Sequence, residues 1–229
     1  GTKLMQSRSQ TIELVVFDWD GTLFDSVGQI VASLQFAAET YQQPLTADAA
    51  KSIIGLGLPE VAQVLFPQVP ELHQDILQCY AAHYVAHSQD DVWFEGVAAL
   101  LHDLKQQGVQ LAVATGKSRQ GLDRVLSQTQ SHDFFVVTRA ASETKSKPDP
   151  LMLLEILAIT GIDVKNAIMV GDSSYDLEMA QNIHMPAIGV SYGVHRAEQL
   201  AAFNPLAIVD DVASLHQLLL RQLKLKRAV

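Results

Sequence analysis

The chain alternates between short apolar runs and longer segments of helical periodicity. Near-continuous apolar runs of four to six residues, each followed by a polar loop, occur at 12–17, 110–114, 134–137, 167–170, 186–190 and 206–209. Such runs are typical of parallel strands that are buried on both faces of a sheet. Helical spacing of apolar residues occurs at 96–107, 118–129, 150–160, 175–181, 196–202 and 212–223. The alternation from residue 92 onward predicts an α/β fold with a doubly wound parallel sheet.

The segment from about residue 26 to residue 92 interrupts this alternation. It shows helical patterns at 27–42, 46–54, 58–66 and 71–88 and no convincing strand. Ser26 and Gln29 have the spacing of a capping box, which predicts that they cap the first of these helices. A helical block inserted after the first strand indicates a second, smaller domain with two hinge connections. We therefore predict a core formed by residues 1–22 and 93–229 and a helical domain formed by residues 23–92.

Composition and charge narrow the class of protein. Of the 229 residues 48% are hydrophobic and 18% are charged, which is enough apolar material for a core and excludes a disordered chain. The 16 Lys and Arg residues against 25 Asp and Glu residues give a formal charge of −9. This balance argues against nucleic acid as a partner, because neutralising phosphates requires a surplus of cations. Any anion that the protein binds must therefore be attracted by a local arrangement of cations.

The sequence also predicts where the protein resides. Cys79 is the only cysteine, so an intrachain disulfide is excluded and no oxidising compartment is implied. No stretch approaches the roughly 18 uninterrupted apolar residues of a membrane helix. Residues 1–10 are polar and lack the apolar segment of a signal peptide. We expect a cytoplasmic protein that has no membrane partner and is a monomer by default, with a dimer not excluded.

Two pairs of carboxylates follow predicted strands. Asp18 and Asp20 belong to the sequence Asp-Trp-Asp-Gly-Thr directly after the first strand, and Asp172 and Asp176 follow the strand at 167–170. The carboxyl ends of parallel strands are where α/β folds bind ligands. An Asp- and Gly-rich turn is the structural alternative for the first pair, and a first-turn carboxylate that favours the helix dipole is the alternative for Asp176. An EF-hand loop is excluded because its fifth and twelfth positions do not fit.

Two further motifs offer groups that bind anions. Thr115-Gly116-Lys117-Ser118 follows the second strand and opens a helix, but Leu111 stands where a P-loop requires glycine. The hydroxyl and backbone N–H groups that remain could bind an anion, and a simple N-cap by Thr115 or Ser118 is the alternative. Lys147 projects from a loop stiffened by two prolines, which favours a functional role. Lys117 and Lys145 lack such support, and we expect them to be surface charges.

These residues together predict a cation site at one edge of the sheet. Clustered carboxylates repel one another and raise each other's pKa unless a cation neutralises them. The donors are all oxygens, since no Cys or His occurs at ligand spacing, and this favours a hard cation. Mg²⁺ is the first choice, because it accepts a few carboxylates, water and a substrate phosphate as ligands. The metal and Lys147 would then form an anion-attracting pocket in an acidic protein.

Over residues 12–210 the sequence resembles the haloacid dehalogenase (HAD) superfamily, and within it the small-molecule phosphatases of the phosphoglycolate phosphatase type. The matching motifs, in order, are Asp18-x-Asp20-Gly21-Thr22, Thr115-Gly116, Lys147-Pro148 and Gly171-Asp172-x-x-x-Asp176. The resemblance implies a Rossmann-like core, and it identifies the helical insertion as a cap of the C1 type. The loop at 53–60 resembles the cap loop that faces the active site in this family.

The resemblance also implies a role for each motif residue. Asp18 would attack phosphorus and form an aspartyl-phosphate, and Asp20 would act as the general acid and then as the general base. The Mg²⁺ ion would be held by Asp18, by the backbone carbonyl of Asp20 and by Asp172, with Asp176 supporting the metal or Lys147. Thr115, the Gly116 N–H and Lys147 would bind the phosphoryl oxygens. The expected activity is hydrolysis of a small phosphorylated metabolite by a Mg²⁺-dependent phosphatase.

Two alternatives remain, and one branch of the superfamily is disfavoured. The dehalogenase branch does not keep an acid at the position of Asp20. The β-phosphoglucomutase branch shares the cap but usually has a different residue where Thr22 stands, so a sugar-phosphate mutase is the first alternative. A phospho-accepting receiver is the remote one, because receivers lack both the Asp-x-Asp spacing and the helical insertion. The loop at 53–60 carries little charge and does not identify the leaving group.

Overall fold

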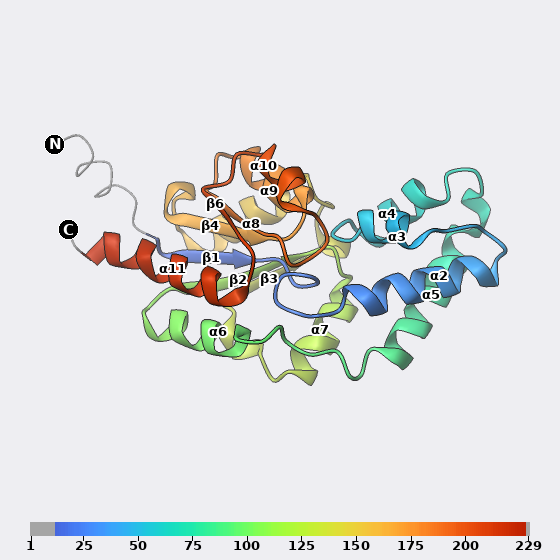
Figure 1. The fold of residues 1–229 in the computed structure, drawn as a ribbon, viewed down its shortest axis with the longest axis horizontal. Coiled ribbons are helices and arrows are strands. Elements are labelled where there is room, and N and C mark those ends of the chain that lie inside the picture. The colour runs from blue at the N-terminus through green and yellow to red at the C-terminus, as the bar shows by residue number, and fades with distance from the viewer. Residues whose placement is uncertain (1–11, 228–229) are drawn as a thin grey trace.

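Within the described residues, six strands form a single parallel sheet in the order β3-β2-β1-β4-β5-β6 (Figure 1). The computed structural model describes residues 12–227, so the polar segment at residues 1–10 lies outside the described residues. The strands are β1 (Leu14–Phe17), β2 (Gln110–Thr115), β3 (Val137–Ala140), β4 (Ala167–Gly171), β5 (Ala187–Val190) and β6 (Ala207–Val209). β1 lies at the centre, where Phe17 is in register with Val113 of β2 and Val170 of β4. The ends of these three strands therefore lie side by side.

Helices cover both faces of the sheet. One face packs against α6 (Val97–Gln106), α7 (Arg119–Gln128) and α11 (Val212–Arg227), and the other against α8 (Leu151–Thr160), α9 (Ser174–Gln181) and α10 (Ala197–Ala201). Alternate residues of β1 supply the two cores: Val15 and Phe17 face the first set of helices, whereas Leu14 and Val16 face the second. Burial on both faces explains the continuous apolar runs. The predicted doubly wound fold is confirmed.

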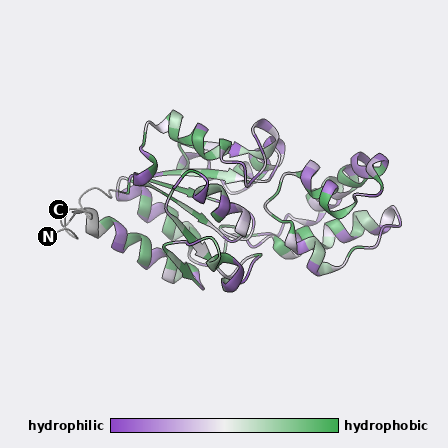
Figure 2. Ribbon diagram, turned by 90° about the horizontal axis from the view of Figure 1, so that it is seen from above, coloured by the Kyte–Doolittle hydropathy of each residue, from purple (hydrophilic) through white to green (hydrophobic). Residues whose placement is uncertain are grey.

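The helical insertion (residues 27–87) lies beside the carboxyl edge of the sheet (Figures 1 and 2). It consists of α2 (Val27–Thr40), α3 (Ala47–Ser52), α4 (Leu58–Leu65), a short 3₁₀ turn at Pro70–Leu72 and α5 (His73–His87). Its apolar cluster is centred on residues of α2 and α5, including Leu34, Ile76 and Tyr80. No helix among residues 12–227 is long and apolar enough to cross a membrane.

Two chain connections join the insertion to the core, and they pair with each other. The Asp25 amide donates to the Val92 carbonyl at 2.9 Å, and the Phe94 amide donates to the Leu23 carbonyl at 3.0 Å. Phe24 forms an isolated antiparallel bridge with Trp93 between these two bonds. The two connections that the sequence predicts as hinges thus lie next to each other.

The strand predicted at 134–137 is wrong in position. Phe134 ends a 3₁₀ turn at His132–Phe134, Val136 is 56% exposed, and the strand begins only at Val137. Phe134 and Phe135 are apolar because they pack against the core from outside the sheet. β3 is an edge strand that pairs only with β2, so its middle positions, Thr138 and Arg139, can be polar.

Candidate active site

The carboxyl ends of β1, β2 and β4 bring the predicted motif residues to one edge of the sheet. Asp18 directly follows β1, and its amide donates to the Val170 carbonyl of β4 at 3.0 Å. Asp172 directly follows β4, and Thr115 is the last residue of β2. All three side chains are buried. Residues that are far apart in the sequence therefore meet because the parallel strands end together.

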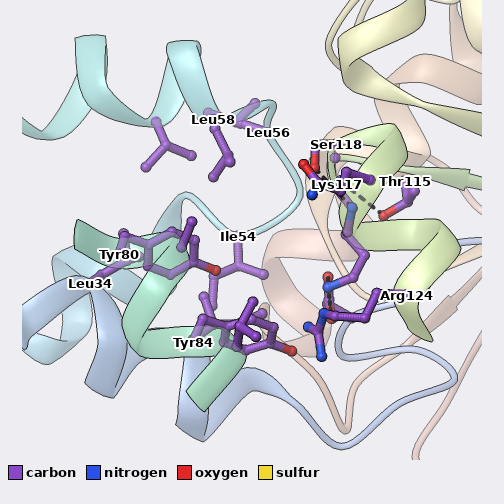
Figure 3. A pocket seen from close by; sticks show the side chains of 18 of the residues that line it. Leu34, Ile54, Leu56, Leu58, Tyr80, Tyr84, Thr115, Lys117, Ser118 and Arg124 are labelled. Atoms are coloured by element: carbon purple, nitrogen blue, oxygen red, sulfur yellow. Dashed lines mark hydrogen bonds and ion pairs between the residues drawn. The ribbon is translucent and has the colours of Figure 1, made fainter. Parts of the chain in front are cut away.

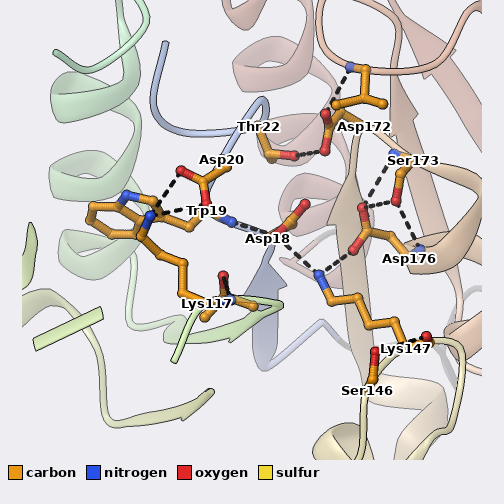
Figure 4. A network of polar contacts seen from close by, with 12 residues as sticks. Asp18, Trp19, Asp20, Thr22, Lys117, Ser146, Lys147, Asp172, Ser173 and Asp176 are labelled. Atoms are coloured by element: carbon orange, nitrogen blue, oxygen red, sulfur yellow. Dashed lines mark hydrogen bonds and ion pairs between the residues drawn. The ribbon is translucent and has the colours of Figure 1, made fainter. Parts of the chain in front are cut away.

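Three carboxylates form a compact cluster at this edge (Figure 4). Each of Asp18, Asp172 and Asp176 offers an oxygen, and these oxygens lie within 4.8 Å of one another. The Lys147 ammonium is fully buried among them, with Nζ 3.0 Å from Asp18 Oδ1 and 2.6 Å from Asp176 Oδ1. One ammonium among three carboxylates leaves two negative charges uncompensated when all three are ionised.

Burial and repulsion shift the pKa values of these groups. Burial, and then the charge of Asp176, raises the pKa of Asp18 well above its ordinary value, although Lys147 opposes the shift. The same two causes raise the pKa of Asp172 to about 6. Burial lowers the pKa of Lys147, but Asp176 and Asp18 outweigh it and hold that pKa above its ordinary value. The protein therefore assembles more negative charge than it neutralises.

The two carboxylates after β4 are held in place by many hydrogen bonds. Asp172 accepts from the Thr22 hydroxyl at 2.9 Å and from the Val194 amide at 2.8 Å. Asp176 accepts from the amide and the hydroxyl of Ser173, which caps α9, at 3.2 and 2.9 Å. Asp176 thus serves both as the first-turn carboxylate that the sequence suggested and as the partner of Lys147.

Gly21 allows the chain to approach Asp172 closely. Its φ of +81° is a conformation that favours glycine, and a Cβ atom there would lie 2.1 Å from Asp172 Oδ2. The turn after Asp20 therefore requires glycine for both conformation and space. This requirement explains why Gly21 stands in the motif between Asp20 and Thr22.

The Asp20 carboxylate lies outside the acidic cluster. Its Oδ1 accepts from the Ser26 hydroxyl at 2.7 Å, and Lys117 Nζ lies 3.2 Å from both of its oxygens. Two predictions are wrong here. Ser26 stands at the N-cap of α2 but makes no side-chain capping bond, because its hydroxyl is committed to Asp20. Lys117 is not a surface charge, since its side chain is only 9% exposed.

The segment after β2 supplies a hydroxyl and a helix N-terminus. Ser118 is the N-cap of α7 and accepts from the Gly121 amide at 3.1 Å, whereas the Thr115 hydroxyl accepts from the Lys117 amide at 3.2 Å. Gly116 lies directly against the helical insertion. A Cβ atom on Gly116 would lie 2.5 Å from the carbonyl oxygens of Gly55 and Leu56. The loop at 53–60 therefore faces this site, as expected.

A pocket of about 560 Å³ opens between this edge and the helical insertion (Figure 3). From the core it is lined by Asp18, Asp20 and the segment from Thr115 to Ser118. From the insertion it is lined mostly by apolar side chains, which include Leu34, Ile54, Leu56, Leu58, Tyr80 and Tyr84. Lys147, Asp172 and Asp176 lie behind Asp18 and do not line the pocket. The structure thus separates the predicted residues into a pocket surface and a buried layer that supports it.

The buried layer fits a hard divalent cation. Its donors are carboxylate oxygens only, which suit Mg²⁺ or Ca²⁺ better than softer metals. Each carboxylate oxygen receives at most two hydrogen bonds from the described residues and can accept more. Burial and the charge of Asp176 raise the pKa values of Asp18 and Asp172, and a bound cation would stabilise the ionised forms of both carboxylates. The residues present therefore fit the metal that the sequence predicted.

Comparisons with known proteins agree with this geometry. Residues 15–190 match the family described as haloacid dehalogenase-like hydrolase. The chain is 35% identical over 217 residues to "Probable phosphatase IndB" of Dickeya dadantii, covering 90% of this chain and 94% of that protein. It is 30% identical over 221 residues to phosphoglycolate phosphatase of Psychrobacter arcticus, covering 91% and 96%. The crystal structure of "a predicted phosphatase from Clostridium acetobutylicum" superposes with a TM-score of 0.82 at 25% identity, covering 93% and 100%.

Proposed function

The chain belongs to the haloacid dehalogenase-like hydrolase family and is a phosphatase, and from this premise we propose that it hydrolyses a small phosphorylated metabolite. The proposed reaction depends on Mg²⁺ and passes through an aspartyl-phosphate intermediate. One observation carries the proposal: Asp18 and Asp20 line the same pocket, but only Asp18 is backed by Lys147 and the acidic cluster. Two carboxylates in such different surroundings suit two different roles.

Asp18 is the nucleophile in this proposal. One of its carboxylate oxygens bonds to phosphorus as the bond from phosphorus to the ester oxygen breaks, and the departing oxygen takes a proton from the Asp20 carboxyl group. The Trp19 amide donates to Asp18 Oδ1 at 2.7 Å, and Lys147 lies 3.0 Å from the same oxygen. These contacts orient the carboxylate and leave Oδ2 to attack.

Asp20 then acts as the base. It accepts a proton from a water molecule, whose oxygen bonds to phosphorus as the bond between phosphorus and Asp18 breaks. Inorganic phosphate leaves, Asp18 is regenerated, and Asp20 again carries the proton of the starting state. The hydrogen bond from Ser26 and the contact with Lys117 fix the position of Asp20 during both steps.

The phosphoryl oxygens are bound by the surrounding donors. Thr115 can donate its hydroxyl proton, because the hydroxyl oxygen accepts from the Lys117 amide. The Lys147 ammonium has three protons and uses two of them on Asp18 and Asp176, which leaves one for a phosphoryl oxygen placed at Asp18. The Gly116 amide is the third donor to the phosphoryl oxygens in this proposal.

Asp18, the backbone carbonyl of Asp20 and Asp172 would hold the Mg²⁺ ion, with Asp176 supporting it through Lys147. When bound, the ion supplies positive charge to the phosphoryl oxygens and to the carboxylates that bind it. We also propose the domain boundaries predicted from the sequence, with residues 23–92 as a cap over the pocket. The cytoplasmic location and the monomeric state stay predictions.

The test is phosphate release from p-nitrophenyl phosphate and from a panel of phosphorylated metabolites, with Mg²⁺ or with EDTA. We expect turnover that requires Mg²⁺ and that falls by at least about 10⁴-fold in Asp18→Asn, because the nucleophile is lost. Asp48→Asn is the matched control, since Asp48 is exposed on α3. Full activity of Asp18→Asn, or no turnover of any substrate, would contradict the proposal. An isomerised sugar phosphate instead of free phosphate would identify a mutase.

A further inference from the structure

The pocket holds a cationic side chain that the reaction at Asp18 does not use. Arg124 lies on α7 and lines the same pocket as Asp18 and Asp20. Among the described residues no carboxylate oxygen lies within 4.0 Å of its guanidinium group. Its Nε atom is buried without a hydrogen-bond partner, and its NH1 group makes only a long contact of 3.5 Å with Gln128.

The guanidinium of Arg124 lies over the aromatic ring of Tyr84 (Figure 3). The Arg124 guanidinium carbon lies 5.6 Å from the ring centroid of Tyr84, and Lys117 Nζ lies 5.0 Å from the same centroid. Tyr84 in turn stacks on Tyr80 at 5.9 Å and donates its hydroxyl to Asp91 at 3.4 Å. Cations over an aromatic face are attracted by the ring. Lys117 and Arg124 thus lie over the same ring, but of the two only Lys117 has a carboxylate partner among residues 12–227.

Arg124 is half-buried, and an anionic group on a ligand would supply the charged partner that its guanidinium lacks among the described residues. Guanidinium presents its N–H groups in a planar fork that binds a carboxylate or phosphate through two hydrogen bonds. Asp20, which lines the same pocket, is already paired with Lys117. The free donors of Arg124 are therefore available to the substrate.

The pocket beside this cation is wide and mostly apolar. Its volume is about 560 Å³, and its wall includes Ile54 and Leu56 together with the rings of Tyr80 and Tyr84. A two-carbon leaving group would fill little of this space, whereas an aromatic ring can pack against apolar and aromatic side chains. Such a wall offers few partners to the hydroxyl groups of a sugar.

We infer that the substrate is an aromatic phosphomonoester whose ring carries an anionic group. The phosphoryl group lies at Asp18, the ring lies in the apolar part of the pocket, and the anionic group pairs with Arg124. The inference rests on the proposed phosphatase function and narrows it. Phosphoglycolate, the substrate in the names of several relatives, would leave most of the 560 Å³ pocket unfilled.

The test compares kcat/KM for 4-carboxyphenyl phosphate, phenyl phosphate and phosphoglycolate. We expect the wild-type protein to prefer the carboxylated ring over phenyl phosphate by roughly tenfold or more, the effect of a charged hydrogen-bond pair. Arg124→Gln should bring that ratio to about one, and Arg124→Lys should restore part of it. Arg221→Gln, an exposed change of the same charge on α11, should leave both the ratio and the activity unchanged.

A binding measurement separates failure of this inference from failure of the proposed function. The dissociation constants of 4-hydroxybenzoate and phenol, the dephosphorylated products, need no turnover. We expect the wild-type protein to bind 4-hydroxybenzoate more tightly than phenol, and we expect Arg124→Gln to bind the two compounds equally. If phenyl phosphate and 4-carboxyphenyl phosphate have the same kcat/KM, the inference is wrong but the proposed phosphatase function stands. A preference for phosphoglycolate would have the same consequence. Absence of all turnover would contradict the phosphatase, while the two products would still test the anion site.

Discussion

The buried layer behind Asp18 and the pocket in front of it differ in how completely their polar groups are engaged. Behind Asp18, Lys147, Asp172 and Asp176 each make at least two short polar contacts. In front, the wall is mostly apolar, and Arg124 has no charged partner within the part of the chain that the structure describes. The first arrangement fixes atoms for a reaction, and the second leaves space and charge for a ligand. Rate and substrate choice should therefore respond to different substitutions.

Among the changes that test this comparison, the largest effect is expected from Asp20→Asn, which tests whether Asp20 has a role separate from that of Asp18. The substitution removes the base, and general acid–base catalysis contributes roughly 10²–10⁴-fold. With p-nitrophenyl phosphate the leaving group needs little protonation, so formation of the aspartyl-phosphate should persist. We expect a burst of about one equivalent of p-nitrophenolate in stopped-flow measurements, followed by slow turnover. A steady rate equal to that of the wild-type protein would contradict the role of Asp20.

A smaller effect on kcat is expected from Lys117→Met, which removes the contact between Lys117 and Asp20 in the pocket in front of Asp18. Asp20 would lose the ammonium 3.2 Å from its carboxylate but keep the bond from Ser26. We expect kcat to fall on the order of tenfold, since orientation is weakened while the acid itself remains. Lys145→Met is the matched control, because Lys145 is exposed in the loop before Lys147. Equal effects of both substitutions on kcat would show that the change in net charge, and not the loss of the contact with Asp20, is responsible.

The smallest effect concerns stability and tests the charge imbalance of the buried layer. Because the pKa of Asp172 is raised to about 6, the folded metal-free protein binds this proton more readily than the unfolded chain does. The contribution of Asp172 to stability is therefore greatest below its ordinary pKa of 3.8 and is lost as the pH rises from there through about 6. Mg²⁺ requires the ionised carboxylate, so it should raise Tm by several degrees above this pH and by less below it.

Thermal unfolding with Mg²⁺ and with EDTA on both sides of about pH 6 measures this effect. Asp172→Asn is the reference, because it cannot titrate, and its Tm should respond little to Mg²⁺ at either pH. A gain in Tm from Mg²⁺ that is independent of pH, or equal in Asp172→Asn, would show that the ion binds elsewhere. The comparison thus tests the buried layer without relying on activity.

The fold was predictable from the sequence because burial imposes strong patterns. Central strands such as β1 and β4 must be apolar on both faces, and their runs appear directly in the chain. The edge strand β3 lacks this constraint, and the aromatic pair Phe134 and Phe135 before it packs on the core from a turn. The prediction therefore failed where an apolar run served packing outside the sheet.

The contacts of single polar side chains were less predictable. Ser26 has the spacing of a helix cap, but tertiary structure places its hydroxyl 2.7 Å from Asp20. Lys117 stands next to Gly116 with no rigid flank, and only the packing of the insertion against the core encloses it. The one available signal was its position inside the Thr-Gly-Lys-Ser segment. Nothing in the sequence distinguishes Arg124 from other charged residues on helices, so its place in the pocket could not be predicted.

The sequence by itself determined the doubly wound sheet, the helical insertion and the set of residues at the strand ends. These follow from local patterns and from the rule that parallel strands end together. Only the tertiary structure decided that Asp20 separates from the other carboxylates, that Lys117 joins it, and that Arg124 remains unpaired in an apolar pocket. The reason is physical: periodicity records which face of an element is buried, whereas polar pairing depends on distances between segments that are far apart in the chain.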